Sequence, residues 1–297
     1  MTVIMKIFLV FTIFIILTLS VLAQSKMADK AQIQQFFKSK TYIVLEANLF
    51  MLYNPTIKDQ VGKHWKITPF EVITQKEFER LKRDPLSSFL FLSTARMSQE
   101  KNMFNTIAGW FSGGKDESSY LILNLVMGVK SGKLNDMPDL GSVPLAMEGA
   151  GEEFYLFKIG GVLKMMQQIV LKLKENPEPD MRKMALENLS KIKTMELWVI
   201  KSQLTSSLQS ETAFKKLYPY SFKFVTADEI EEAVNQSRNI IFLHKIGPEE
   251  AEITEEAFCT KFILSAADGQ LLWVSRHKVS KKKPDAMLEE DLREMLK

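Results

Sequence analysis

Few residues in this chain of 297 could carry out acid–base, nucleophilic or metal chemistry. It contains three histidines, His64, His244 and His277, and a single cysteine, Cys259. No two of these residues have the spacing of a metal-binding pair, such as positions i and i+4 of one helix. The sequence therefore predicts no metal site, and we expect each histidine at the surface or at the end of a strand. A composite site formed by residues distant in sequence stays open.

The patterns of nucleophilic and phosphate-binding sites are also missing. A serine nucleophile needs a tight glycine-flanked turn, and Cys259 lies in an apolar run typical of a strand, where a reactive thiolate is unfavourable. The segment SGGKDESS, residues 112–119, has a lysine after two glycines, but a phosphate-binding loop also needs an earlier glycine and a Ser or Thr after that lysine. Asp116 stands there instead. The sequence assigns no catalytic residue and no cofactor, and it favours a protein that is not an enzyme.

The amino terminus has the order of a secretory signal peptide. Lys6 precedes an apolar run at residues 7–19, and the small residue Ala23 stands where a signal peptidase would cut. A retained membrane anchor is the alternative, since an apolar stretch of about 18 residues can span a bilayer. The order of charge, apolar run and small residue favours cleavage. Residues 1–23 are therefore predicted to be removed, which leaves a mature protein with no stable membrane span.

Composition is that of an ordinary globular protein and does not suggest nucleic-acid binding. Hydrophobic residues make up 46% and charged residues 25%, which provides enough apolar material for a core. The formal net charge is only +3, and the basic run at residues 281–283 is typical of a solvated turn. A single cysteine allows no internal disulfide, which favours a bacterial periplasm or cell surface. Two Asn-x-Ser sequons, at Asn188 and Asn235, keep a eukaryotic extracellular protein as the alternative.

One local pattern occurs twice in the chain. At residues 70–77 an apolar run leads into a Thr-x-x-Glu capping box, in which Thr74 and Glu77 satisfy two amide groups at a helix start. Flanking apolar residues, Ile73 and Phe78, have the spacing of a hydrophobic staple. The second occurrence has the box and the staple at equivalent places: Thr226, Glu229, Val225 and Ile230.

The spacing of the following strands supports a duplication. Phe89 follows Thr74 by 15 residues, and Ile241 follows Thr226 by 15 residues. Both lie in short apolar runs typical of buried strands. Each copy then reads as strand, helix, strand, helix, strand and a terminal hairpin, explicit in the second copy at Asp268-Gly269 and weaker in the first around Gly132. The predicted fold class is α/β (α+β-like), with two similar β-α-β-α-β-β modules in tandem joined by a helical linker.

The module boundaries follow from these patterns. Residues 24–150 form the first module, with an amino-terminal helix and an insertion at about 94–117. Residues 151–193 form the helical linker, and residues 194–297 form the second module with a carboxy-terminal helix. Apolar residues at three-and-four spacing predict the buried face of the first linker helix: Val162, Leu163, Met166, Ile169, Val170 and Leu173. A second linker helix is predicted from a further apolar set: Met184, Leu186, Leu189 and Ile192.

In element order, each module resembles the small α/β modules of exported envelope proteins, such as the amino-terminal domain of TolB and the periplasmic part of curli-secretion lipoproteins. The resemblance covers the order of elements and no shared sequence motif. It implies a small envelope module and transfers no functional residue.

The insertion is the candidate partner-binding segment. The first copy has about 14 more residues than the second between its third and fourth strands, since Phe89 to Tyr120 spans 31 positions and Ile241 to Phe258 spans 17. Long loops with their own apolar content are often functional. Its apolar residues fall at helical spacing, and the candidate partner-binding set is Phe104, Ile107, Trp110 and Phe111. A flap that packs over its own sheet is the alternative.

The function that the sequence favours is an exported, non-enzymatic binding or assembly protein of the cell envelope. An envelope protein is the expected partner, and the oligomeric state stays open. Two alternatives remain: an exported hydrolase-like enzyme with a composite site, and a small-molecule binding protein with a cleft between the modules. Polar side chains that converge in one cleft would favour either alternative, whereas an exposed apolar patch would favour the interaction protein.

Overall fold

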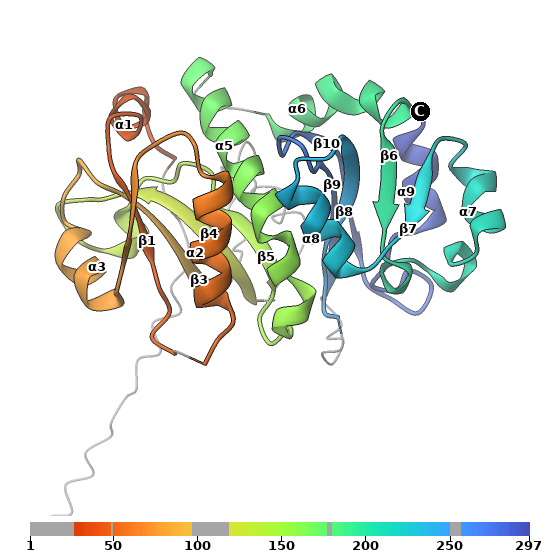
Figure 1. Cartoon of the computed structure of the whole chain (residues 1–297), viewed down its shortest axis with the longest axis horizontal. Helices are drawn as coiled ribbons and strands as arrows, with labels where there is room; N and C mark the ends of the chain where they lie inside the picture. Colours follow the sequence, from red (N-terminus) through yellow and green to blue (C-terminus); the bar gives the residue numbers. More distant parts are fainter. Residues whose placement is uncertain (1–26, 49, 97–118, 177–179, 250–256) are drawn as a thin grey trace, which may run out of the picture.

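The computed structural model of the chain describes residues 27–48, 50–96, 119–176, 180–249 and 257–297 (Figure 1). These residues form a mixed α/β structure with two five-stranded mixed sheets and eight α-helices. No helix within them is long and apolar enough to cross a membrane. The predicted signal peptide lies outside the described residues.

Sheet one has the strand order β2-β1-β3-β4-β5. Strand β1 pairs in parallel with β2 and β3, and β3–β4 and β4–β5 are antiparallel pairs. The strands of sheet one are β1 (Thr41–Val44), β2 (Phe70–Ile73), β3 (Ser88–Arg96), β4 (Ser119–Met127) and β5 (Val143–Met147).

Sheet two has the order β7-β6-β8-β9-β10, with the same strand directions as sheet one. Each sheet therefore has five strands, one more than the abbreviated β-α-β-α-β-β order predicts. The turn at Asp268-Gly269 joins β9 to β10 as expected, whereas β5 follows β4 through a longer connection at residues 128–142. The strands of sheet two are β6 (Glu196–Val199), β7 (Phe222–Phe224), β8 (Ile240–Ile246), β9 (Phe258–Ser265) and β10 (Leu271–Lys278).

Both predicted capping boxes begin helices. Thr74 and Glu77 exchange contacts at the start of α3, with 2.8 Å from Thr74 N to Glu77 Oε2 and 3.3 Å from Glu77 N to Thr74 Oγ1. Thr226 and Glu229 do the same at the start of α8, at 2.9 and 3.2 Å. The described helices are α1 (Lys30–Phe36), α2 (Tyr53–His64), α3 (Gln75–Leu81), α5 (Ile159–Glu175), α6 (Met181–Asn188), α7 (Glu211–Leu217), α8 (Ala227–Asn235) and α9 (Glu289–Met295).

Helix α5 lies in the middle of the molecule, between the two sheets (Figure 1). Twelve of its 17 residues are buried, including every residue of its predicted apolar face. Two glycines allow close contact on both sides: a Cβ on Gly160 would lie 2.2 Å from Gln60 Oε1 of α2, and one on Gly161 would lie 2.6 Å from the Phe242 ring of β8. The helix predicted as part of a linker is thus a core element that both sheets share.

The two sheets turn different faces towards α5. Right-handed crossovers place α2 and α3 on opposite faces of sheet one, and α7 and α8 on opposite faces of sheet two. These faces are termed the α2/α7 face and the α3/α8 face. Leu90 of β3 and Ile57 of α2 share the central apolar cluster with Phe242 of β8 and Ile230 of α8. Sheet one therefore buries its α2/α7 face centrally, and sheet two buries its α3/α8 face.

The orientation of two strands corrects one argument for the duplication. Phe89 packs in the cluster of Phe78, on the α3/α8 face of sheet one. Ile241 packs in the cluster of Phe214, on the α2/α7 face of sheet two. Adjacent residues of a strand point to opposite faces, so the structural equivalent of Ile241 is Leu90. The matching spacing of 15 residues therefore pairs side chains that face opposite sides.

Candidate functional site

Four lysine side chains are buried within the described residues, and the sequence analysis identified none of them. Lys158 and Lys164 lie at or near the start of α5, Lys245 lies in β8, and Lys261 lies in β9. Lys261 is fully buried and Lys245 is 2% exposed. A buried lysine needs a charged or hydrogen-bonding partner because desolvation of its ammonium group is costly. Their partners therefore show where polar contacts hold the fold together.

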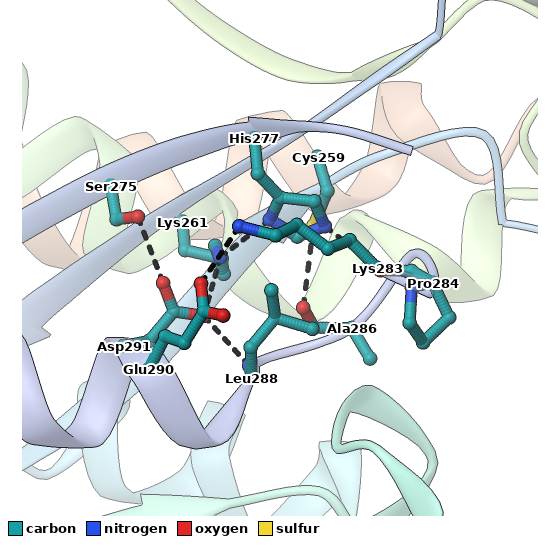
Figure 2. Close-up of polar contacts among 10 residues, drawn as sticks. All are labelled: Cys259, Lys261, Ser275, His277, Lys283, Pro284, Ala286, Leu288, Glu290 and Asp291. Atoms are coloured by element: carbon teal, nitrogen blue, oxygen red, sulfur yellow. Dashed lines mark hydrogen bonds and ion pairs between the residues drawn. The ribbon is translucent and has the colours of Figure 1, made fainter. Parts of the chain in front are cut away.

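Lys261 is at the centre of a polar cluster on the α2/α7 face of sheet two (Figure 2). Its Nζ lies 2.5 Å from Asp291 Oδ2, on the first turn of α9. The same carboxylate accepts hydrogen bonds from Ser275 Oγ at 2.8 Å and from the Leu288 amide at 2.7 Å. All these partners lie in β10 or in the carboxy-terminal segment. The cluster therefore pins α9 to strands β9 and β10.

His277 completes this cluster and is not free to act as a base. Its Nδ1 lies 2.9 Å from Lys261 Nζ, and its Nε2 lies 2.9 Å from the Pro284 carbonyl oxygen. The lysine can only donate and the carbonyl can only accept, so the ring is neutral and carries its proton on Nε2. Burial lowers the pKa of His277, and the charge of Lys261 lowers it further. Both ring nitrogens are thus engaged.

Cys259 is the cross-strand partner of His277 but does not form a nucleophilic pair with it. The thiol is buried and donates a hydrogen bond to the Ala286 carbonyl oxygen, which lies 3.8 Å from Sγ. Burial raises the pKa of the Cys259 thiol, and Asp285 adds to this effect. A protonated, buried thiol is a poor nucleophile. Cysteine, histidine and aspartate side chains lie close together in this cluster, but their contacts hold the fold together and do not form a reactive site.

A second buried pair fixes the same carboxy-terminal segment. Lys245 Nζ lies 2.7 Å from Asp285 Oδ2 and 2.9 Å from Glu249 Oε1. Burial acts to lower the pKa of Lys245, but the nearby Asp285, Cys259 and Glu249 outweigh it and the pKa is raised. The charged form is therefore the one that folding favours. Two lysines on neighbouring strands each hold one aspartate of the segment that ends in α9.

The other two histidines join the first module to the second. His64, at the end of α2, lies with Nε2 3.0 Å from Asn235 Oδ1 of α8, and His244 Nε2 lies 3.1 Å from the Pro144 carbonyl oxygen of β5. Burial is the main cause that lowers the pKa of both rings. The expectation of surface or strand-end positions was wrong for these two, because the contact between the modules buries them.

Two lysines of the α5 region also cross between the modules. Lys164 Nζ donates to the carbonyl oxygens of Val234 and Ala266, both at 2.7 Å, and so caps the end of α8. Lys158 Nζ donates to the Lys245 carbonyl oxygen at 2.9 Å. Burial lowers the pKa of Lys158 to about 7 and that of Lys164 to about 8. These amines act as hydrogen-bond donors inside the interface.

The described surface is hollowed beside the edge of sheet two. A groove of about 630 Å³ is lined by residues of α7 and of the edge strand β7. The strand contributes three successive residues to it, and α7 contributes charged side chains. The residues that define this β7 groove are Glu211, Lys215, Ser221, Phe222, Lys223 and Phe224. Sequence reasoning missed it, because a short parallel edge strand has no distinctive pattern.

The four predicted partner-binding residues, Phe104, Ile107, Trp110 and Phe111, lie outside the described residues, so their role stays a prediction. Their segment joins Arg96 at the end of β3 to the start of β4. The exposed side chain of Phe50, on the loop after β1, belongs to the same end of sheet one, since β1 and β3 are parallel.

Comparison with known proteins gives no relative for this chain. No protein-family model, no curated protein and no solved structure matches it. Within the described ranges no group of three or more His, Cys, Asp or Glu side chains is arranged to hold a metal ion. Only the contacts and surfaces of this chain therefore bear on its function.

Proposed function

We propose that the protein is an exported, non-enzymatic binding or assembly protein of the cell envelope, built from a duplicated α/β module. One observation carries the proposal: the described histidine, cysteine and buried lysine side chains contact other parts of the chain, whereas the hollowed surface at the β7 groove is free for a partner. A catalytic group needs access to its substrate. The described geometry supports binding better than catalysis.

The repeated topology supports a duplication. Both sheets have the same strand order and directions, and both second crossover helices begin with a capping box. A further helix follows the fifth strand in each module and packs on the α2/α7 face: α5 after β5, and α9 after β10. The likeness of this element order to the small modules of exported envelope proteins is part of the proposal.

The contact between the modules favours a surface site over an inter-module cleft. Helices α2, α5 and α8 meet there with buried apolar side chains from all three. Gln60 of α2 also lies within hydrogen-bond distance of Glu231 of α8, at 3.3 Å. A small molecule between the modules would have to displace these contacts, which makes a small-molecule binding protein the weaker proposal.

The two sequon asparagines support a bacterial envelope over a glycosylated extracellular protein. Asn235 Oδ1 contacts His64, and Asn188 Nδ2 donates to the Met184 and Leu271 carbonyl oxygens at 3.0 and 3.3 Å. A glycan would replace one of the two hydrogens on Asn188 Nδ2, so one of these hydrogen bonds would be lost, and glycans are bulky surface groups. The apolar leader at residues 7–19 supports export.

Fractionation of the native cell combined with affinity recovery tests the proposal. The tagged full-length protein should appear in the soluble periplasmic or cell-surface fraction. Its mass should be that of a mature chain that begins at Gln24. After mild cross-linking it should recover an envelope protein. A protein that keeps residues 1–23, stays in the cytosol, or recovers no envelope protein from its own fraction would contradict the proposal.

A further inference from the structure

Strand β7 has a free main-chain edge. Among the described residues it pairs only with β6, and this pairing uses the Ser221 carbonyl oxygen, 3.0 Å from the Leu197 amide, and the Val225 amide, 3.1 Å from the Val199 carbonyl oxygen. Alternate residues of a strand direct their amide and carbonyl groups to opposite edges. Phe222 and Phe224 therefore direct theirs away from β6, towards the groove.

The side of the groove is formed by aromatic side chains and α7. The ring of Phe214, on α7, lies 4.6 Å from the ring of Phe222 and 5.7 Å from that of Phe224, measured between centroids. A strand added to the β7 edge would place every second side chain next to these rings and the adjacent turn of α7. The groove thus offers main-chain pairing on one side and apolar contact on the other, the combination used in strand-addition binding.

Two lysines mark the ends of this edge. Lys215 donates to the Pro219 and Tyr220 carbonyl oxygens, at 3.0 and 3.1 Å, just before β7 begins. Lys201 lies over the Phe224 ring, 5.0 Å from its centroid, where β7 ends. Among the described carboxylates, none forms an ion pair with either lysine.

The nearby acids leave this positive charge in excess. Glu229 is paired with Lys223 at 2.8 Å, and Glu211 on α7 is the one acidic side chain among the described residues that line the groove. A chain lying along β7 would pass one cation at each end of the strand. Because a strand rises about 3.3 Å per residue and its side chains alternate between faces, acidic side chains about four positions apart would lie on one face and meet both lysines.

We propose that the β7 groove binds an extended, acidic peptide segment of a partner protein, which adds a sixth strand to sheet two. This inference rests on the proposed binding function and names the partner's chemistry. A second copy of the chain is a poorer occupant: antiparallel β7 strands from two copies would bring Lys215 of one copy next to Lys201 of the other. Like charges at such a contact oppose pairing.

Labelled peptides test the inference directly. The probe is the acetylated and amidated peptide EVTVEV, compared by fluorescence anisotropy with KVTVKV and with an EVTVEV whose alternate amides are N-methylated. We expect EVTVEV to bind about five- to tenfold more tightly than KVTVKV, since each surface ion pair contributes modestly, and we expect N-methylation on the pairing edge to remove binding. Equal binding of all three probes would overturn the inference.

Charge reversal supplies the matched variants. Lys201→Glu combined with Lys215→Glu should reverse the preference, so that KVTVKV binds more tightly than EVTVEV. Lys216→Glu, an exposed neighbour on α7 that does not line the groove, should leave the preference unchanged. Circular dichroism should show both variants folded. A folded double variant that keeps the original preference would show the inference to be wrong, and so would sedimentation showing a dimer that the single substitution Lys215→Glu strengthens.

Affinity recovery separates failure of this inference from failure of the proposed function. If the wild-type protein recovers an envelope partner and the Lys201→Glu, Lys215→Glu variant recovers it equally, the partner binds elsewhere and the groove inference fails alone. If neither protein recovers a partner, the proposed function fails. Loss of recovery in the double variant, with recovery intact in Lys216→Glu, is the expected result.

Discussion

The α2/α7 faces of the two sheets have the same topology but different covers. On sheet one the cover is α5, a 17-residue helix that contacts apolar side chains such as Leu90 and is itself buried by the second module. On sheet two the cover is the carboxy-terminal segment with α9, a helix of seven residues. Two lysine–aspartate pairs hold that segment, Lys245–Asp285 and Lys261–Asp291.

The difference follows from where each helix lies. A helix packed from both sides buries enough apolar area to fix its position without a buried ion pair, and Lys164 adds only hydrogen bonds to the Val234 and Ala266 carbonyl oxygens. A short terminal helix keeps one side in water and buries less, so its register depends on contacts with defined geometry. Buried ion pairs contribute little net stability, but they penalise every arrangement that separates their charges. On this hypothesis the lysine–aspartate pairs specify the position of the last segment more than they stabilise it.

The largest expected effect comes from leaving Lys261 unpaired. Asp291→Ala removes the carboxylate that contacts Lys261, Ser275 and the Leu288 amide, and an unpaired buried charge costs about 3–5 kcal/mol. Urea unfolding should show this loss. The matched control is the double variant Lys261→Met, Asp291→Leu, in which no buried charge remains and stability should stay within about 1 kcal/mol of wild type or rise. A loss below about 1 kcal/mol for Asp291→Ala would contradict the role of the pair.

The second prediction concerns the apolar cover. Leu163→Ala, in the fully buried part of α5, removes side-chain volume from the core that both modules share and should cost about 2–5 kcal/mol. Because α5 packs against both sheets, fluorescence and circular dichroism should report one common unfolding transition. Leu171→Ala, on the exposed side of the same helix, should change stability by less than about 1 kcal/mol. Two separated transitions for Leu163→Ala would show that the modules unfold independently.

The third prediction concerns Lys158, whose amine is buried without an ion pair in the contact between the modules. Burial lowers its pKa from the ordinary value of 10.5 to about 7. Between these values the unfolded chain binds more protons than the folded chain, so this group makes wild-type stability rise with pH across the window. Lys158→Met should therefore raise stability most at or below pH 7, by up to a few kcal/mol, with the gain shrinking towards pH 10.5.

Urea titrations at several pH values measure this effect. The exposed Lys66→Met is the control and should show the wild-type pH dependence. If Lys158→Met has the same dependence as wild type between pH 7 and 10, the buried amine does not titrate in that window. Lys158 would then keep its proton in the folded protein, as a buried cation that no described carboxylate pairs with.

Local patterns in the sequence predicted local structure well. Thr74 and Thr226 begin α3 and α8 as expected, because a capping box acts within four residues and depends on nothing distant. The apolar face of α5 was also correct, since three-and-four spacing is a property of the helix itself. Its place between the sheets was not predicted, because an apolar face does not specify which surface will cover it. The alternation of Phe89 and Leu90 shows the same limit for strands, where one residue changes the face.

The sequence did not predict the buried lysine–aspartate contacts, for a different reason. Lys245 and Lys261 stand in apolar strands, where a single lysine is usually read as a solvated residue or an edge marker. Their partners Asp285 and Asp291 lie 40 and 30 residues away, in a segment that the sequence describes only as a terminal helix. The pairing is set by how this segment crosses the sheet. No spacing rule connects residues across such a distance.

The smallest predicted effects compare the two capping boxes. Thr226→Ala should lower the free energy of unfolding by about 1 kcal/mol, because α8 belongs to the central cluster and is lost only when the whole molecule unfolds. Thr74→Ala removes the same hydrogen bonds from α3, which packs in a small outer cluster. Its effect on global unfolding should be smaller, about 0.5 kcal/mol or less. Hydrogen exchange should instead show faster exchange of the α3 amides alone.

The variants Thr74→Ser and Thr226→Ser keep the hydroxyl group and should restore most of each loss. Equal effects on global unfolding, with no local change in α3, would show that the outer and central faces have the same cooperativity.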